Sequence, residues 1–255
     1  MPSHVMTTVP HLHDKSIVTF QNRRRPSLAL SSPKLSIHCG NLSAELLGLE
    51  PSIFSSIAQT VDLVIHCGAN RSLWDAYPAL RSANVIGTKT LIALASHNRA
   101  PVHFLSSGTV TDVPDGAVPP TDGSNGYVAS KWASERLLEN AAAQLGVPAI
   151  FHRPTKAADL HPPSEALLGE LKSLVERMRC VPISGGWNGT FVIMPVTVMA
   201  ESVVATALES SSEGGKQGIS IEEHVGMIKL EMSDVLKVTQ EGQNSPLKAL
   251  INYQP

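Results

Sequence analysis

The chain has 255 residues, of which 42% are hydrophobic and 16% are charged, and its formal net charge is −2. This composition excludes a disordered tail, and the length suffices for one α/β domain with a small additional lobe. The near-neutral charge gives no reason to expect nucleic acid or an anionic membrane as a partner. No apolar stretch reaches the roughly 20 residues that cross a bilayer, and residues 1–14 lack the apolar core of a secretory signal. We therefore expect a cytoplasmic protein; the sequence does not indicate its oligomeric state.

The cysteines give no sign of a disulfide framework or a metal centre. Cys39, Cys67 and Cys180 show neither paired nor metal-ligand spacing. We expect them to be buried and unreactive in a reducing compartment, and we expect no metal site.

The N-terminal part of the chain carries one strand signal. Residues 1–15 show no periodicity, so we expect a disordered N-terminus. Residues 16–20 are typical of a strand, and Arg23, Arg24 and Arg25 follow it closely. Such a run is either a solvated, charged loop or a site for a phosphate monoester, because arginine makes bidentate contacts with phosphate. The sequence supports the two interpretations about equally.

Strand and helix signals alternate along the rest of the chain. Further strands are expected around 34–39, 61–67, 102–105 and 148–155, with helices over 52–60 and 77–97 and a third that begins near residue 126. Beyond residue 160, the signals are a helix over 165–179, a strand over 189–195 and a helix over 198–209. This alternation predicts an α/β fold with a parallel sheet covered on both faces over residues 16–160. Residues 161–255 are expected to form a smaller lobe that borders the site.

Small and polar residues follow one of the central strands. Gly68 and Ala69 end the strand around 61–67, where they either allow a ligand to approach the backbone closely or simply form a tight turn. Asn84, in the long helical pattern over 77–97, is either an exposed helix residue or one that holds a water or a backbone bend behind the site.

The strongest candidate for chemistry is a tyrosine–lysine pair. Tyr127 and Lys131 are four residues apart at the start of a helix, so they lie on the same helix face. A nearby ammonium favours the phenolate, which makes the phenol a usable proton donor near neutral pH. About twenty residues earlier, an apolar run ends in Ser106 and Ser107, as expected of a buried parallel strand that opens onto a ligand site.

The order Ser, Tyr, Lys resembles the catalytic arrangement of short-chain dehydrogenase/reductases. Within that superfamily the chain resembles the terminal thioester reductase domains of nonribosomal peptide synthetases and polyketide–peptide hybrids. The matching segments are 40–43, 46–49, 64–69, 77–85, 87–88, 106–107, 127–131 and 152–154, in the same order as in that family. The resemblance implies an extended, Rossmann-like doubly wound parallel sheet that binds NAD(P), with a small C-terminal substrate lobe.

The resemblance also implies roles for individual residues. Ser107 holds the substrate carbonyl, Tyr127 donates the proton, and Lys131 binds the nicotinamide ribose and tunes Tyr127. The residues expected to bind the cofactor, NADPH, are Arg23 and Arg24 at its 2′-phosphate, Asn41, Leu42, Gly68 and Ala69 at the adenine and pyrophosphate, Asn84, and Pro154 at the nicotinamide. The substrate is an acyl or peptidyl thioester on a carrier protein, which the reaction releases as an aldehyde.

One part of the family pattern is not found. Folds of this kind open with a strand, a glycine-rich turn and a helix whose N–H groups hold the pyrophosphate. Here the first glycine is Gly40, and only fifteen residues precede the strand at 16–20. We therefore expect the first βα unit to be missing and NADPH binding to be impaired. Two alternatives to a reductase remain: redox-independent release by Dieckmann cyclisation, and a catalytically inactive remnant.

Overall fold

A computed structural model describes residues 4–8, 16–21, 35–38, 40–72, 74–123, 125–158, 190–212, 218–226 and 228–231. The chain divides into two compact units. The first comprises Met1–Arg153 with Val203–Glu223, and the second comprises Pro154–Ser202 with His224–Pro255. The candidate site is built in the first unit.

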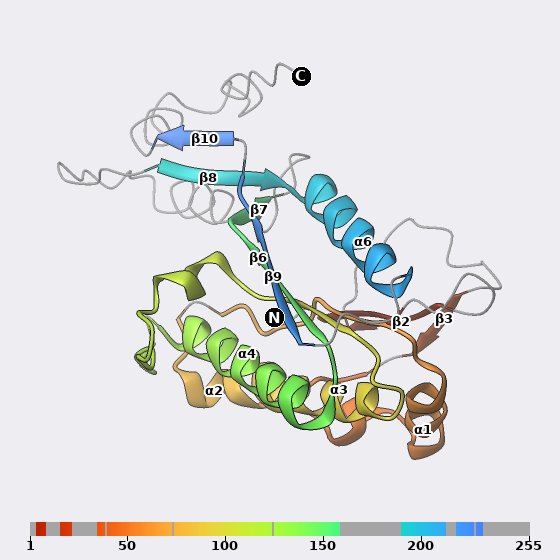
Figure 1. The fold of residues 1–255 in the computed structure, drawn as a ribbon. Helices are drawn as coiled ribbons and strands as arrows, with labels where there is room; N and C mark the ends of the chain where they lie inside the picture. The colour runs from red at the N-terminus through yellow and green to blue at the C-terminus, as the bar shows by residue number, and fades with distance from the viewer. Residues whose placement is uncertain are drawn as a thin grey trace, which may run out of the picture. The chain divides into compact units, whose positions relative to one another are not determined.

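A seven-stranded sheet forms the centre of the first unit (Figure 1). Its strands are β1 (His4–Thr8), β2 (Ser16–Gln21), β3 (Leu35–His38), β4 (Val64–His66), β5 (Val102–Leu105), β6 (Ala149–Pro154) and β9 (Ile219–His224), in the spatial order β3-β2-β1-β4-β5-β6-β9. The neighbours β4, β5 and β6 are parallel, as are β2 and β3. The α/β fold expected from the sequence is confirmed.

The structure differs from the sequence prediction at β1. Residues 4–8 form a strand within the stretch 1–15 that was expected to be disordered, and this strand lies between β2 and β4. It runs antiparallel to both neighbours, pairing Met6 with His66 on one side and with Thr19 on the other. Five residues carry little periodic signal of their own. The two flanking strands supply the pairing partners, and strand propensity depends strongly on such context.

Four helices cover one face of the sheet (Figure 1). These are α1 (Pro51–Thr60), α2 (Tyr77–Arg81), α3 (Gly87–Ser96) and α4 (Gly126–Leu145), and a π-helical turn (η2, Ser82–Ile86) joins α2 to α3. Alternate residues of the parallel strands, among them Val102, Phe104 and Phe151, pack against these helices in one hydrophobic cluster. Because β4 and β5 are buried on both faces, their residues do not alternate between buried and exposed positions.

The second unit contains a three-stranded sheet of β7 (Lys156–Ala158), β8 (Thr190–Pro195) and β10 (Ile228–Glu231), in the order β10-β8-β7. Helix α6 (Val196–Ser212) begins in this unit and ends in the first. The helix expected over 165–179 lies outside the described residues. None of the helices in the described part of the chain combines the length and the apolar character that a bilayer-crossing segment requires.

Candidate active site

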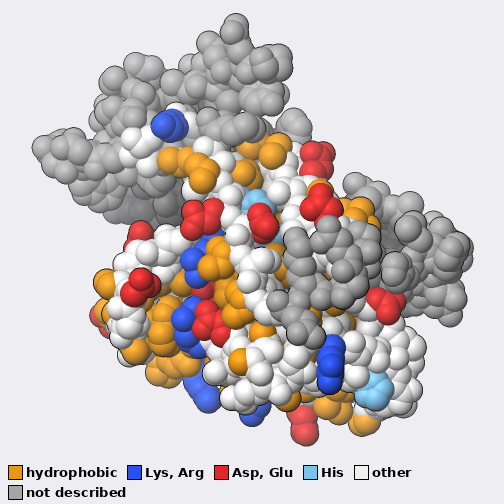
Figure 2. Space-filling view, in the orientation of Figure 1, with side chains coloured by type: hydrophobic (Ala, Val, Ile, Leu, Met, Phe, Trp, Pro, Cys, Tyr) orange, Lys and Arg blue, Asp and Glu red, His pale blue; other side chains and the backbone are white. Residues whose placement is uncertain are grey.

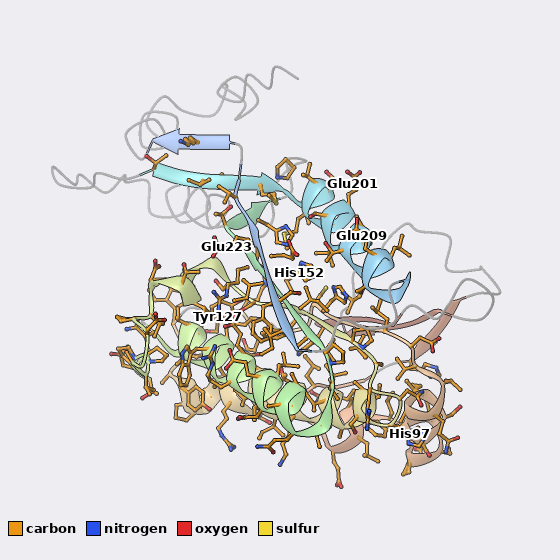
Figure 3. All side chains as sticks on the ribbon, in the orientation of Figure 1. His97, Tyr127, His152, Glu201, Glu209 and Glu223 are labelled. Carbon is orange, nitrogen blue, oxygen red and sulfur yellow. The ribbon has the colours of Figure 1, made fainter. Side chains whose placement is uncertain are left out.

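Helix α4 begins where a loop leaves no room for a side chain. A Cβ atom on Gly126 would lie 2.6 Å from the backbone nitrogen of Tyr77 and would also overlap the carbonyl oxygen of Asp75. Glycine therefore lets the loop before α2 pack directly on the first turn of α4. Tyr127, the next residue, is fixed at this contact, at the start of α4 (Figure 3).

Lys131 lies one turn further along α4 and points toward the end of β5. Its side chain is 2% exposed, and its Nζ donates a 2.7 Å hydrogen bond to the carbonyl oxygen of Leu105. The same nitrogen lies 4.7 Å from the ring centroid of Phe104 and 5.9 Å from that of Tyr127. Burial lowers the pKa of Lys131 to about 8, opposed by the nearby Cys67 and Glu135. The ammonium form still predominates at neutral pH.

The Tyr127 phenol is not acidified in this structure. Burial raises its pKa to about 12, and Arg71, on the loop after β4, acts in the opposite direction. The sequence predicted that Lys131 would lower this pKa. The effect of desolvation on the phenolate is larger, since the ammonium lies 5.9 Å from the ring centroid and is engaged by the carbonyl oxygen of Leu105. Tyr127 is therefore a neutral hydrogen-bond donor around pH 7.

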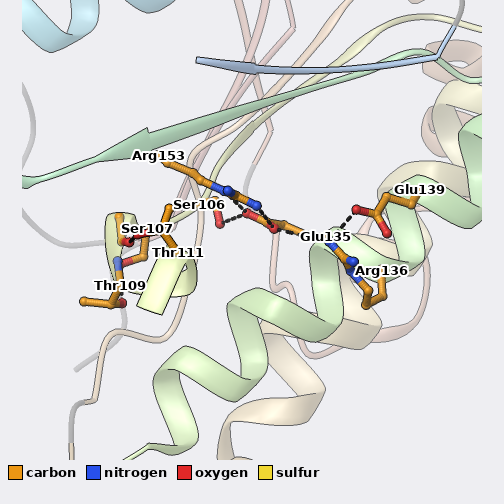
Figure 4. Close-up of polar contacts among 9 residues, drawn as sticks. Ser106, Ser107, Thr109, Thr111, Glu135, Arg136, Glu139 and Arg153 are labelled. Atoms are coloured by element: carbon orange, nitrogen blue, oxygen red, sulfur yellow. Dashed lines mark hydrogen bonds and ion pairs between the residues drawn. The ribbon is translucent and has the colours of Figure 1, made fainter. Parts of the chain in front are cut away.

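Ser107 lies two residues after the end of β5 and caps a 3-10 turn (η3, Gly108–Asp112) that packs against α4. Its Oγ lies 2.8 Å from the Thr109 hydroxyl and accepts a long hydrogen bond from the Thr109 amide (Figure 4). The neighbouring Ser106 instead donates a 2.6 Å hydrogen bond to Glu135. The two serines thus have separate partners. That Ser107 and Tyr127 converge on one carbonyl oxygen stays a prediction.

Asn84 is buried in the π-helical turn and holds a backbone bend, one of the two roles expected from the sequence. Its amide oxygen accepts a 2.7 Å hydrogen bond from the Asn70 backbone nitrogen, and its amide nitrogen donates to the Asn70 carbonyl at 3.0 Å. The same nitrogen donates to the Ser130 hydroxyl at 2.9 Å. Asn84 therefore ties the loop after β4 to helix α4.

The other residues expected at the cofactor fall into different environments. Gly68 and Ala69 are buried and begin two residues after the end of β4. Asn41 is exposed, and its side chain accepts a hydrogen bond from the backbone of Ser43. Leu42 belongs to the hydrophobic cluster, so its side chain is part of the core. Pro154 ends β6 and begins the second unit, whereas Arg23 and Arg24 lie outside the described residues.

One buried ionic network was not predicted. Glu135 is fully buried on α4 and binds Arg153 of β6 through both carboxylate oxygens, at 3.0 Å and 2.7 Å (Figure 4). Ser106, at the end of β5, donates to the same carboxylate. A signal was present in the sequence, because Glu135 follows Lys131 by four residues and Tyr127 by eight, which places all three on one helix face.

The opposite face of the sheet holds a cluster of His103, His152 and Ser210, called the neutral cluster here because it contains no Asp, Glu, Lys or Arg. His103 of β5 and His152 of β6 are buried, and Nδ1 of His103 lies 2.9 Å from Nε2 of His152. Figure 3 labels His152. Ser210 of α6 lies 2.9 Å from Nε2 of His103. Burial lowers the pKa of His103 to about 4. Ser210 also lines a cavity of about 320 Å³ at the amino ends of β5 and β6, the edge opposite to Ser107.

The described residues include no group of three or more His, Cys, Asp or Glu side chains that could hold a metal ion. Cys67 is half-buried, and burial raises the pKa of its thiol to about 11. On the described part of the viewed face, acidic and basic side chains are interspersed among hydrophobic ones (Figure 2).

The chain is similar to a family model, to known sequences and to solved structures. The family model described as male sterility protein, an NAD-binding model, matches residues 14–203. Hybrid PKS-NRPS synthetase buaA of Petromyces alliaceus is 43% identical over 224 residues, which cover 82% of this chain and 6% of that synthetase. The crystal structure of the terminal R domain from the myxalamid PKS-NRPS biosynthetic pathway is similar with a TM-score of 0.63 and 23% identity, over 82% of this chain and 55% of that one.

A second solved structure, MoeE5 in complex with UDP-glucose and NAD, has a TM-score of 0.61 at 20% identity, over 86% of this chain and 71% of that one. These likenesses confirm the Rossmann-like fold. The expected resemblance to hybrid PKS-NRPS enzymes is confirmed by the 43% identity to buaA. The match to the family model covers most of the chain. The chain belongs to the NAD-binding family described as male sterility protein.

Proposed function

We propose that the chain is a release domain that reduces an acyl or peptidyl thioester, held on a carrier protein, with NADPH as cofactor. The observation that carries the proposal is the position of Lys131: a buried ammonium at the end of β5, beside the ring of Tyr127 and one turn from the helix start. The PKS-NRPS relatives and the R-domain fold support the substrate class.

Tyr127 and Ser107 would stabilise the charge that develops on the thioester oxygen. When a nucleophile adds to the carbonyl, the oxygen becomes an oxyanion, and aligned donors in a water-poor site stabilise it strongly. Tyr127, with a pKa of about 12, keeps its proton and can donate it into a hydrogen bond throughout the neutral range. The fixed ammonium of Lys131 adds positive potential on the same helix face.

The residues fit the nicotinamide end of the cofactor better than its pyrophosphate end. Lys131 would hold the nicotinamide ribose at the end of β5. On the adenine and pyrophosphate side, the buried Gly68 and Ala69 allow close approach to the backbone after β4. When bound, NADPH would supply the hydride. The strand beside β4 offers no matching cradle, because β1 contains no glycine and runs antiparallel to β4.

The direction of β1 favours a second candidate, release without a hydride. In Dieckmann cyclisation, a carbon between two carbonyl groups loses a proton and attacks the thioester carbonyl. A carbon–carbon bond forms, the carbon–sulfur bond breaks, and the carrier thiol leaves. The same two donors, Tyr127 and Ser107, would stabilise the tetrahedral oxyanion. Because the reaction transfers no hydride, it needs no pyrophosphate site.

Turnover with and without nucleotide separates the two candidates. The purified chain is incubated with an acyl pantetheine thioester, and with a β-ketoacyl-aminoacyl pantetheine thioester, each with NADPH, with NADH and without nucleotide. We expect an aldehyde from the first substrate only in the presence of NADPH. Cyclised product without nucleotide would establish the second candidate and overturn the first.

The inactive alternative gives a third pattern. If neither product forms and NADPH causes no saturable quenching of intrinsic fluorescence, the proposed function is wrong for this chain.

A further inference from the structure

We propose that Glu135 is a positioning residue of the active site: by binding Ser106 and Arg153 it fixes the register of helix α4 against the ends of β5 and β6. The inference rests on the proposed function, since it concerns the placement of Tyr127 and Lys131. Glu135 itself would not touch the substrate.

The network joins three segments through one carboxylate. Oε1 of Glu135 accepts hydrogen bonds from the Ser106 hydroxyl at 2.6 Å and from Nε of Arg153 at 3.0 Å, and Oε2 accepts from an Arg153 Nη atom at 2.7 Å. Each partner directly precedes a residue that the sequence placed in the site, Ser107 and Pro154 respectively. A shift of α4 by one residue would therefore break every one of these bonds.

The spacing along α4 carries the effect to the catalytic pair. Tyr127, Lys131 and Glu135 are four residues apart, so they form a single stripe that faces the sheet. Lys131 is attached to β5 through the Leu105 carbonyl, one residue before Ser106. Two anchors, four residues apart on the helix and adjacent on the strand, leave α4 little freedom to slide or rotate.

A carboxylate suits this place better than an amide. Arg153 presents two parallel N–H donors, and both carboxylate oxygens can accept. A glutamine would turn an NH₂ group toward one of these donors and leave a part-buried guanidinium without its counter-charge.

The charge of Glu135 also acts on Lys131. Glu135 and Cys67 both raise the pKa of Lys131, against the lowering effect of burial. The phenol of Tyr127 faces the same ammonium. Around Glu135 itself, the charged neighbours are Arg153, Arg136 and Glu139, and Glu223 of β9 acts on Arg153.

The test is the Glu135→Gln variant of the full chain, with Glu139→Gln as the matched control. Glu139 lies one turn further along α4 and pairs with Arg136, whose side chain is 43% exposed. The titration of Lys131 is followed by NMR of protein labelled with isotopes at its lysines, and the signal is assigned with Lys131→Met. We expect Glu135→Gln to lower the midpoint by about one pH unit and Glu139→Gln to leave it unchanged.

Activity provides a second readout. With the acyl pantetheine thioester and NADPH, Glu135→Gln should lower kcat by about a hundredfold, because a displacement near 1 Å is enough for such a loss. KM should change much less, since Glu135 does not contact the substrate. The alkaline limb of the pH–rate profile should move with the Lys131 midpoint.

Two further variants keep the proposal falsifiable if Glu135→Gln does not fold. Glu135→Gln with Arg153→Gln removes both charges of the ion pair together, which is less destabilising than removing one. Ser106→Ala keeps the ion pair and removes one hydrogen bond. The double variant should be more stable than Glu135→Gln, but its Lys131 midpoint should not return to the wild-type value. Ser106→Ala should lower kcat and should lose less stability than Glu135→Gln.

The proposal is overturned if the Lys131 midpoint and the pH–rate profile keep their wild-type values in the Glu135 variants. It is also overturned if Glu139→Gln shifts the Lys131 midpoint as much as Glu135→Gln does. The titration needs no turnover. If the wild-type chain releases no product, the proposed function fails while the Lys131 midpoints still decide whether Glu135 acts on this helix face.

Discussion

The two faces of the parallel strands bury polar side chains in opposite ways. On the face toward α4, Lys131 and Glu135 are buried and Arg153 is 13% exposed, and these groups are held by a bidentate ion pair and a backbone carbonyl. On the other face, His103 and His152 are buried as imidazoles in hydrogen-bond contact, and the pKa of His103 is lowered to about 4.

The difference indicates what each face is for. Burying a charge is unfavourable unless its partners are complete, and a hydrophobic replacement of a buried ion pair is often neutral or stabilising. A fold that retains such a network beside Tyr127 therefore gains something other than stability from it, which we identify as the placement of α4. The neutral face satisfies its polar atoms without a net charge, as a structural core does.

The largest effect is expected when the charged face loses one member of its ion pair. Arg153→Met leaves the fully buried carboxylate of Glu135 without its guanidinium, and breaking a buried pair in this way costs about 3–5 kcal/mol. Urea unfolding at neutral pH measures the loss. The matched variant Arg136→Met removes a half-exposed arginine from the same helix region and should cost less than about 1 kcal/mol. Equal losses in the two variants would contradict the contrast between the faces.

Tyr127→Phe removes the proposed oxyanion donor from the charged face. We expect kcat for thioester release to fall by about a hundredfold to a thousandfold, the usual effect of deleting one such donor. The unfolding midpoint should change little, because the ring is retained. Tyr77→Phe, at the start of α2, serves as the control and should keep activity. Unchanged turnover in Tyr127→Phe would show that Tyr127 is not the donor of this reaction.

The parallel strands and the helices on one face were predictable because their signals are local. The strand expected at 16–20 is β2, and the helix expected over 77–97 runs from Tyr77 through the π-helical turn to Ser96. In both cases the chain's own pattern of apolar residues or of helical spacing decides the outcome.

Features that depend on distant partners were not predictable in the same way. Strand β1 owes its place to pairing with β2 and β4, which no pattern within residues 4–8 reveals. The pKa of Tyr127 depends on burial, which a sequence spacing of four residues does not report. The ion pair of Glu135 and Arg153 joins residues 18 positions apart, and only the fold brings them together.

The neutral face should make the folded protein less stable at acidic pH. Because the folded-state pKa of His103 is lowered from 6.5 to about 4, the unfolded chain binds a proton that the folded chain does not. Stability from this group is complete above about pH 6.5 and is lost as the pH falls toward about 4, by up to roughly 3 kcal/mol. His103→Gln should flatten this part of the stability profile, whereas His97→Gln, at an exposed position, should not. Parallel acid profiles in the wild type and His103→Gln would show that His103 is not the neutral buried group described.

The smallest expected effect comes from the edge of the neutral cluster. Ser210→Ala removes the hydroxyl that lies 2.9 Å from Nε2 of His103, and loss of one such hydrogen bond costs about 1 kcal/mol. Activity should stay within about twofold of wild type, because Ser210 lies beside the amino ends of β5 and β6, away from Ser107 and Lys131. Denaturant unfolding and thioester turnover are measured on the same preparation. A large loss of kcat with unchanged stability would place catalysis partly on the α6 face. The assignment of the site to the charged face and of a purely structural role to the neutral face would then be wrong.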